Sequence, residues 1–472
     1  MVSGAELWRA SARGLADLIR TRQASSREVV QAHLQRIEAV NGAVNAVTVV
    51  LAEEALAAAT AADAALASGA PIGPLHGVPV TVKENIDLVG SATTHGSVAL
   101  SDALPPGDAP HIAQLKVAGA IPIGRTNVPD FALRWHTDSG LRGLTRNPWN
   151  PMRSPGGSSG GDAVAIATGM TPLGVGNDYG GSLRVPSQFC GVAAIRPTLG
   201  RVAWVPLLEP QVHPFTIQHF WVQGPMARHI EDVRIALEAM SGPDPRDPRW
   251  VPAPAQGPSW PGPVPVAFTM DPAGQGTDQD VAAGVRRAAA ALRDAGYQVE
   301  EVEPPDVAAA ADTWAKLVMT ELRLVVFPRL EAASSADAVQ FLRFAFENVP
   351  PLDLQGYMEV IAARFAHARA WSEFQARWPL VLGPVYTQQP WPLRFDTAGR
   401  EEVGRLVQGM RLVVVCNLLG LPAASVPVGV AQGLPQGVQI IGPRYREDLC
   451  LNAAQAIEDR LGAITPIGPR PE

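Results

Sequence analysis

Three groups of residues in this chain have the side chains needed for acyl chemistry. Two are clusters of serine and glycine, at 154–161 and 178–184, and the third is Lys83 at the end of the apolar run 78–82. A lysine and two serines can supply a base, a relay hydroxyl and a nucleophile without a histidine. The pattern therefore indicates hydrolysis of an acyl bond by a Ser–Ser–Lys system.

Lys83 stands out because the chain has almost no other lysine. Only Lys83, Lys116 and Lys316 occur in 472 residues, so arginine carries nearly all of the positive charge. Lysine has an ordinary pKa of about 10.4 and must be desolvated to be neutral at working pH. The apolar run before Lys83 favours that, although Glu84 would oppose it unless its side chain points away.

The first cluster, 154–161, has several interpretations. A phosphate-binding loop would need Lys-Ser or Lys-Thr after the last glycine, where Asp162 stands. A nucleophile elbow would need a preceding strand, which the prolines between 148 and 155 do not allow. It would also need a late histidine, and His367 is the last one in the chain. A flexible linker stays open for this segment taken alone.

The second cluster follows a strand expected at 173–175 and places a serine after two glycines. Its consecutive backbone N–H groups could line an oxyanion hole, formed by Tyr179, Gly180, Gly181 and Ser182. Removing one such donor costs about 2.7–4 kcal/mol of transition-state stabilisation. A serine after Gly-Gly is otherwise an ordinary turn residue, so neither cluster decides the chemistry alone.

Together with Lys83, the two clusters resemble the amidase signature family of serine hydrolases. The likeness covers about 25 to 460 and is weakest across 245–400. Its most specific part is Gly-Gly-Ser-Ser-Gly-Gly at 156–161 followed by Gly-Asn-Asp-Tyr-Gly-Gly-Ser-Leu-Arg-Val-Pro at 176–186. The other matching stretches are 77–85, 124–127, 145–149, 196–201, 420–427 and 433–435.

The resemblance implies an α/β fold with a central mixed β-sheet covered by helices on both faces. It implies one domain over 1–472, with a catalytic core at about 70–205 and a variable substrate-shaping region at about 245–400. By position, Ser182 would be the nucleophile, Ser158 the bridging serine on a cis peptide bond, and Lys83 the base. Neutral Lys83 would take the proton of Ser158 while Ser158 takes that of Ser182.

Several positions depart from the usual family pattern. Asn177 stands where most members have Thr, Arg196 where Lys is usual, and Glu84 where Asp is common. Tyr179 is bulkier than the usual occupant of the oxyanion loop, which predicts an effect on pocket shape. We expect Asp178 and Arg184 to form a structural pair that clamps the nucleophile loop.

The expected function is hydrolysis of the C–N bond of small or aryl-bearing amides. Carbamates (urethanes) and aryl esters are chemically adjacent substrates. The alternative is one subunit of a glutamine-dependent amidotransferase that acts in a complex, and a third is a non-catalytic scaffold. Trp135, Trp204 and Trp221 either line an acyl pocket or lie in the core, and Trp135 is the candidate substrate-binding residue among them.

Composition limits the partners and the compartment. The net charge is −7 with no basic run, so nucleic acid is not an expected partner. Three widely spaced cysteines, no apolar signal segment and no 18-residue apolar stretch predict a cytoplasmic protein without disulfides. His95, His111 and His136 lack metal-ligand spacing, so no metal or cofactor is expected. The resemblance favours a homodimer.

The elements that position these residues alternate between helix and strand. Ser25 to Glu28 predicts a capping box, followed by helices to about 37 and over 51–67. Further helices are predicted at 109–118, 163–168, 278–295 and 446–461, and a mostly helical stretch at 305–395. Strands are predicted at 78–82, 121–124, 173–175, 264–269 and 298–302, with strand-like runs at 412–430 and 437–441. A Pro-rich link is predicted between Ser241 and Pro263.

Overall fold

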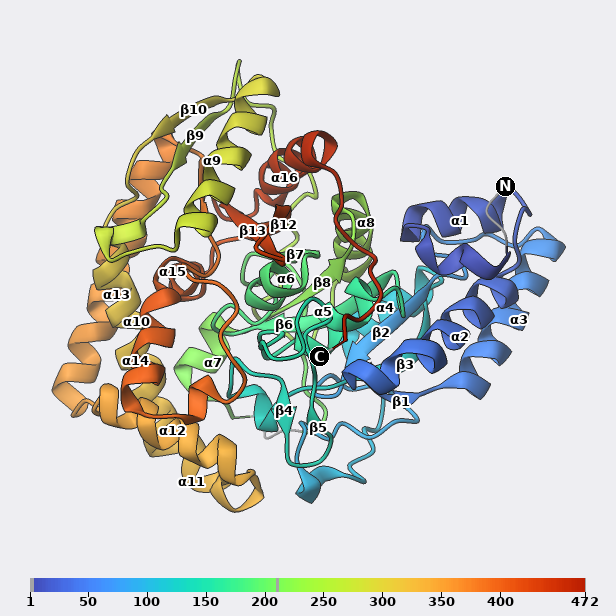
Figure 1. The fold of residues 1–472 in the computed structure, drawn as a ribbon, viewed down its shortest axis with the longest axis horizontal. Helices are drawn as coiled ribbons and strands as arrows, with labels where there is room; N and C mark the ends of the chain where they lie inside the picture. The colour runs from blue at the N-terminus through green and yellow to red at the C-terminus, as the bar shows by residue number, and fades with distance from the viewer. Residues whose placement is uncertain (1–3, 209–211, 472) are drawn as a thin grey trace.

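A mixed β-sheet runs through the middle of the molecule (Figure 1). The computed structural model describes residues 4–208 and 212–471, and within them eleven strands form this sheet in the order β1-β3-β2-β6-β8-β7-β12-β13-β11-β9-β10. The strands are β1 (Val47–Val50), β2 (Pro79–Lys83), β3 (Ile121–Thr126), β6 (Leu173–Asp178), β7 (Ala193–Arg196), β8 (Val222–Ala227), β9 (Pro265–Phe268), β10 (Gln298–Glu301), β11 (Leu380–Pro384), β12 (Ala423–Ala431) and β13 (Leu434–Ile441). A separate hairpin pairs β4 (Asp138–Ser139) with β5 (Gly143–Leu144).

Both strand directions occur in the large sheet. β2 is parallel to β3 and β6, and β9 is parallel to β10 and β11. β8 and β12 run antiparallel to their neighbours, as does β13. The predicted α/β class with a mixed sheet is therefore confirmed.

Side chains of β2 alternate between the two faces of the sheet, and this alternation positions the lysine. Val80 and Val82 belong to a core that also contains buried side chains of α8, α9 and α16. Thr81 and Lys83 point to the opposite face, because successive residues of a strand project to opposite sides. That face carries α5, which packs against β2 and β6.

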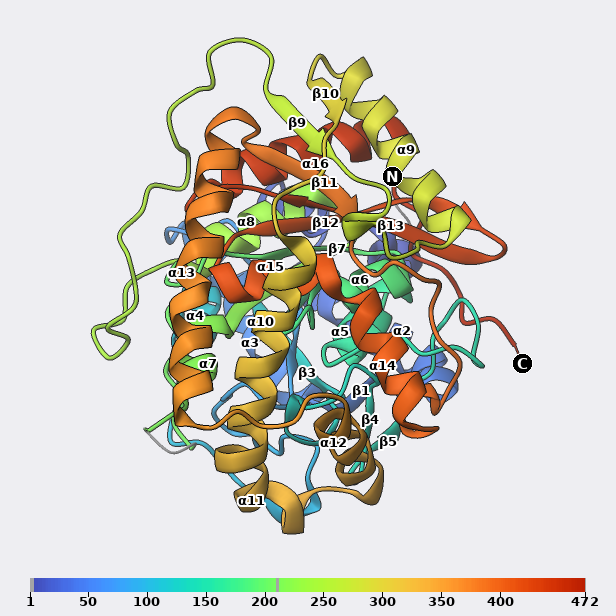
Figure 2. The same cartoon turned by 90° about the vertical axis from the view of Figure 1, so that its left-hand side faces the viewer.

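Helices cover both faces of the sheet, as predicted. Figure 2 views the molecule from the side on which α10, α13 and α14 form a helical layer, and their apolar side chains share a core with α15. The helices are α1 (Ala12–Arg20), α2 (Ser26–Val44), α3 (Ala52–Ser68), α4 (Pro110–Val117), α5 (Gly160–Ala167), α6 (Arg184–Cys190), α7 (Phe215–Phe220), α8 (Ile230–Met240), α9 (Gln279–Asp294), α10 (Val307–Glu321), α11 (Phe327–Leu330), α12 (Ala336–Asn348), α13 (Leu354–Arg377), α14 (Arg400–Gly409), α15 (Arg411–Leu419) and α16 (Glu447–Leu461).

Local signals in the sequence locate most elements correctly. The Ser25–Glu28 capping box is present at the start of α2. The strand–helix–strand unit after the Pro-rich link appears as β9, α9 and β10. The stretch 305–395 is mostly helical, and it also contains the buried strand β11.

The prediction of a strand-like run over 412–430 is wrong in its first half. Residues 411–419 form α15, whose side chains are all buried, and β12 begins only at Ala423. A helix buried on every side shows no apolar periodicity, so its β-branched run resembles a buried strand. Gly420, with φ of 67°, caps the helix in the left-handed region that suits glycine.

Each cysteine, at 190, 416 and 450, is buried and forms no disulfide. Within residues 4–208 and 212–471, no helix combines the length and the apolar character needed to cross a membrane. In the same part of the chain, no group of three or more His, Cys, Asp or Glu side chains is arranged to hold a metal ion.

Candidate active site

Lys83 ends β2 and is fully buried on the α5 face of the sheet. Its Nζ lies 2.8 Å from Ser158 Oγ, 2.9 Å from Ser159 Oγ and 2.8 Å from Asn177 Oδ1. The predicted base and bridging serine are therefore in direct contact. Ser159 and Asn177 complete the contacts of the amine, and no role at the site was predicted for either of them from the sequence.

The first serine–glycine cluster forms a tight loop that leads into α5. The peptide bond between Gly157 and Ser158 is cis. A Cβ on Gly157 would lie 2.6 Å from the carbonyl carbon of Trp135 and 2.8 Å from the amide nitrogen of His136. Glycine is needed at 157 because two backbone segments pass within contact distance of each other.

The second cluster connects β6 to α6 and carries Ser182. The backbone carbonyl of Ser182 accepts a hydrogen bond from the amide of Ser159 at 3.2 Å, which ties the two clusters together. Ser182 is 5% exposed, and within the described residues its hydroxyl has no hydrogen-bond partner. The loop that carries Ser182 therefore lies against the loop that carries Ser158, near the ends of the parallel strands β2 and β6, where open α/β sheets commonly place their sites.

Asp178 and Arg184 form the predicted structural pair. The Arg184 guanidinium donates from Nε to Asp178 Oδ2 at 3.0 Å and from Nη2 to Oδ1 at 3.1 Å, and both side chains are fully buried. Burial alone would raise the pKa of Asp178, but Arg184 and Arg196 hold it well below its ordinary value. The ionised carboxylate also accepts from the amide of Gly181 at 2.9 Å, which fixes the turn before Ser182.

This last bond bears on the oxyanion hole expected from residues 179–182. The N–H of Gly181 already has Asp178 as its acceptor. For the amides of Tyr179, Gly180 and Ser182, the structure gives no acceptor among the described residues. These three remain the candidates for binding an oxyanion.

Trp135 lies beside the nucleophile loop. Its Nε1 donates to the carbonyl of Gly180 at 2.8 Å, and its ring packs against Trp314 and Phe341 at centroid distances of 6.2 and 6.0 Å. With Ser182 it lines a narrow cavity of about 30 Å³. Trp135 therefore lines the cavity next to Ser182, and its hydrogen bond to Gly180 also holds the nucleophile loop in place.

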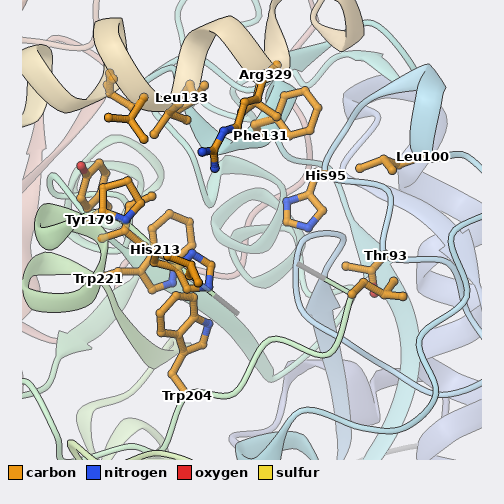
Figure 3. A pocket seen from close by; sticks show the side chains of 18 of the residues that line it. Thr93, His95, Leu100, Phe131, Leu133, Tyr179, Trp204, His213, Trp221 and Arg329 are labelled. Carbon is orange, nitrogen blue, oxygen red and sulfur yellow. The ribbon is translucent and has the colours of Figure 1, made fainter. Parts of the chain in front are cut away.

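A larger apolar pocket of about 280 Å³ adjoins this cavity (Figure 3). The two share Leu133, Tyr179 and Leu322. Trp204 and Trp221 line the large pocket, stacked with their centroids 6.2 Å apart, so the acyl-pocket interpretation of these two fits the structure better than the core interpretation. Other lining side chains are Thr93, His95, Phe131, His213, Ile217 and Arg329.

Tyr179 lines both cavities, and its hydroxyl is held by a chain of hydrogen bonds. Its hydroxyl lies 2.7 Å from Thr216 Oγ1, and the amide of Thr216 donates to Glu321 at 2.8 Å. Tyr357 of α13 donates to the other oxygen of Glu321 at 2.5 Å. No pattern in the sequence predicts a role for Thr216 or Glu321, because Tyr179, the residue that they hold, is far from both in the chain.

Electrostatics around Lys83 favour the neutral amine. Burial lowers its pKa from the ordinary lysine value, while the carboxylates of Asp162 and Asp178 act in the opposite direction. Burial also raises the pKa of Asp162, whose Oδ1 accepts from Thr126 Oγ1 at 2.7 Å. Glu84 points away from the amine and pairs with Arg142 at 2.7 Å, so it does not oppose neutrality directly.

The histidines at 95, 111 and 136 are all buried. Burial lowers the pKa of His95, His111 and His136 to about 4, so each is neutral at physiological pH. His136 Nδ1 lies 2.7 Å from Ser154 Oγ, and His95 lines the large pocket. The hydrogen-bonding neighbours of Lys83 Nζ are instead the two serines and Asn177.

Comparison with known proteins identifies the family. The family model described as Amidase matches residues 28–451. The chain belongs to the amidase signature family. It is a hydrolase that acts on carbon–nitrogen bonds.

Relatives within the family differ in their activities. The chain is 45% identical to an indoleacetamide hydrolase of Bradyrhizobium diazoefficiens, over 97% of this chain and 88% of that protein. It is 33% identical to a glutamyl-tRNA(Gln) amidotransferase subunit of Moorella thermoacetica, over 96% and 97% of the two chains. A bacterial aryl acylamidase of the amidase signature family superposes with a TM-score of 0.82 at 26% identity, covering 96% of each chain.

Proposed function

We propose that this amidase hydrolyses primary amides with a small aryl group on the acyl side, such as arylacetamides, through an acyl-enzyme on Ser182. The contact of Lys83 Nζ with Ser158 Oγ at 2.8 Å, in a fully buried setting, is the observation that carries the proposal. It supports the predicted order of proton transfer, from Ser182 to Ser158 and from Ser158 to neutral Lys83.

In the proposed reaction, Ser182 Oγ attacks the amide carbon as its proton passes to Ser158. The oxyanion that forms is held by N–H groups of the loop, for which Tyr179, Gly180 and Ser182 are the candidates. Lys83 then returns the proton through Ser158 to the leaving nitrogen, and the C–N bond breaks. Water repeats the attack on the acyl-enzyme with the same relay and releases the acid.

The two cavities support the choice of substrate class. A volume of about 280 Å³ lies just below the usual range of ligand pockets, roughly 300–1,000 Å³, and suits a one- or two-ring group. The stacked Trp204 and Trp221 offer flat apolar surfaces to such a group. The cavity of about 30 Å³ beside Ser182 holds a group no larger than a few atoms, which suits departing ammonia. The name of the indoleacetamide hydrolase relative agrees with this class.

Carbamates and aryl esters belong to the same proposal, because attack on their carbonyl follows the same course. The relative at 33% identity supports a second candidate function, that of one subunit of a glutamine-dependent amidotransferase. The apolar lining of the large pocket argues against glutamine, whose side chain ends in a polar amide. A homodimer, rather than a complex with other chains, is the assembly that accompanies the hydrolase proposal.

The test is turnover of indole-3-acetamide by the purified chain, with acetamide, an anilide, a carbamate, an aryl ester and glutamine as comparison substrates. We expect the arylacetamide to give the highest kcat/KM. Ser182→Ala and Lys83→Ala should each lower kcat at least about 10³-fold. A fluorophosphonate should label Ser182 in the wild type. Undiminished turnover by Ser182→Ala would refute the mechanism, and a preference for glutamine would favour the amidotransferase.

A further inference from the structure

The amine of Lys83 has more hydrogen-bonding neighbours than a neutral amine has hydrogens. Ser158 Oγ, Ser159 Oγ and Asn177 Oδ1 all lie within 2.9 Å of Nζ. A neutral amine offers two N–H donors and one lone pair, whereas an ammonium offers three donors. The three neighbours therefore divide into two acceptors and one donor when Lys83 is ready to act as a base.

Asn177 must be one of the two acceptors. A side-chain amide oxygen has no hydrogen to donate. The orientation of this amide is fixed from its other end, because Asn177 Nδ2 donates to Asn85 Oδ1 at 3.0 Å. Both asparagines are buried, with 1% and 9% of their surface exposed, so water does not compete for these bonds.

Ser159 is the second acceptor. Its hydroxyl donates to the backbone carbonyl of Asn177 at 3.3 Å, which leaves only its lone pairs to face Nζ. The two N–H groups of the neutral amine are then both engaged. The remaining direction, toward Ser158, is that of the lone pair.

We propose that Asn177, oriented by Asn85, is a positioning residue that holds the lone pair of neutral Lys83 on the hydroxyl of Ser158. Ser158 then donates its hydrogen to Nζ, and the lone pairs of its oxygen are available for the proton of Ser182. This inference rests on the proposed Ser182–Ser158–Lys83 reaction. Asn177 acts through the lysine and does not itself touch the substrate in this proposal. Most members of the family have Thr at this position.

Substitutions at 177 test whether Asn177 orients the amine of Lys83 or only packs against it. Asn177→Leu removes the acceptor, so one N–H loses its partner and the lone pair is no longer directed; we expect kcat to fall about 10- to 100-fold with KM nearly unchanged. Asn177→Thr restores an acceptor and should recover most of the lost kcat. Asn177→Asp places an anion against the amine and should move the acidic limb of the kcat/KM profile to higher pH by about one unit or more.

The other charges around the lysine stay the same in these variants. The charged and titratable groups that act on the Lys83 amine from neighbouring elements are Asp162 on α5, Asp178 on β6 and His95 on the segment after β2. Arg125 on β3 donates to the backbone carbonyl of Lys83, and Glu84 points away and pairs with Arg142. Asn41→Asp is the matched control, because it makes the same amide-to-carboxylate change in α2. Among the described residues, the Asn41 side chain bonds only to the backbone of 46 and 47. This control should leave the acidic limb in place.

Each outcome bears on one proposal or the other. Wild-type kcat in Asn177→Leu together with an unmoved acidic limb in Asn177→Asp overturns the inference. If Asn177→Leu does not fold, as judged by its circular dichroism melting curve, Asn85→Leu serves in its place. It frees the Asn177 amide to turn, and we expect a loss of about tenfold in kcat; unchanged kcat there overturns the inference too. Activity retained by Lys83→Ala and Ser182→Ala would instead refute the proposed function.

Discussion

At the scale of single residues, desolvation favours the neutral form of Lys83. Its Nζ is buried among two hydroxyls and an amide oxygen, none of which carries a full charge. Removing an ammonium from water disfavours its charged form, and this lowers its pKa. Asp162 acts against this effect, because its carboxylate favours the ammonium.

Asp162→Asn should therefore extend activity to lower pH. The proposed base works only when it is neutral, so kcat/KM rises as pH passes through the lowered pKa of Lys83. Removing the carboxylate removes a stabiliser of the ammonium, lowers that pKa further, and should move the acidic limb down by about one unit. The measurement is kcat/KM for an arylacetamide over a range of about four pH units around neutrality.

Asp232→Asn is the control for this prediction. Asp232 is also a buried carboxyl of raised pKa, on α8, but it accepts from the backbone amides of Ala12 and Arg13 and has no part in the surroundings of Lys83. An acidic limb that moves equally in both variants, or moves upward in Asp162→Asn, would contradict the assigned role of Asp162.

At the scale of elements, one buried ion pair joins four segments around the nucleophile loop. Asp178 ends β6, and Arg184 begins α6. Arg184 also donates to Gln439 of β13 at 2.9 Å and to Asn417 of α15 at 2.8 Å. The position of Ser182 thus depends on strands and helices that are more than 200 residues apart in the chain.

Arg184→Met should destabilise the protein strongly. The substitution leaves the Asp178 carboxylate buried without its principal cation, and breaking a buried pair in this way costs about 3–5 kcal/mol. We expect a matching decrease in the free energy of unfolding from urea titration, and loss of turnover because the turn before Ser182 loosens.

Arg369→Met breaks an exposed pair with Glu373 on α13 and provides the comparison. An exposed pair is screened by solvent and contributes little to stability, so the free energy of unfolding of this variant should be close to that of the wild type. Equal destabilisation of the two variants would show that the Asp178–Arg184 pair has no special structural role.

At the scale of the whole molecule, the pocket takes its walls from segments that are far apart in the chain. The large pocket combines the segment 93–103, the 131–133 turn, Trp204, Leu208, the segment 212–221 and the 322–330 helices (Figure 3). The last of these lie in the region 245–400, for which the family resemblance predicts a role in shaping the substrate site. Leu322 and Leu330 from that region line the pocket.

Trp221→Ala should weaken binding of aryl substrates selectively. Trp221 packs against both Trp204 and Tyr179, at centroid distances of 6.2 and 5.7 Å, so its loss removes a flat apolar wall. We expect KM for indole-3-acetamide to rise about tenfold while KM for acetamide changes little. Trp250→Ala, outside the pocket, is the control. Equal changes for both substrates would argue against an aryl site here.

The sequence by itself determined the family, the sheet class and the choice of Lys83, Ser158 and Ser182 as the proposed catalytic groups. Those residues lie in continuous motifs whose glycines and short side chains are required by close backbone contacts, as at Gly157. Local patterns such as the capping box of α2 could also be predicted, because they depend on neighbours in the chain.

Tertiary structure alone decided which groups surround the motifs. The pairing of Asn85 with Asn177, the use of the Gly181 amide by Asp178, and the chain from Tyr179 to Glu321 join residues that local patterns cannot connect. The buried helix α15 was predicted wrongly for a related reason, since burial on all sides removes the periodicity that reveals a helix. The hydrogen bonds and the burial of Lys83 depend on the folded structure around it, and together they set the pKa of its amine.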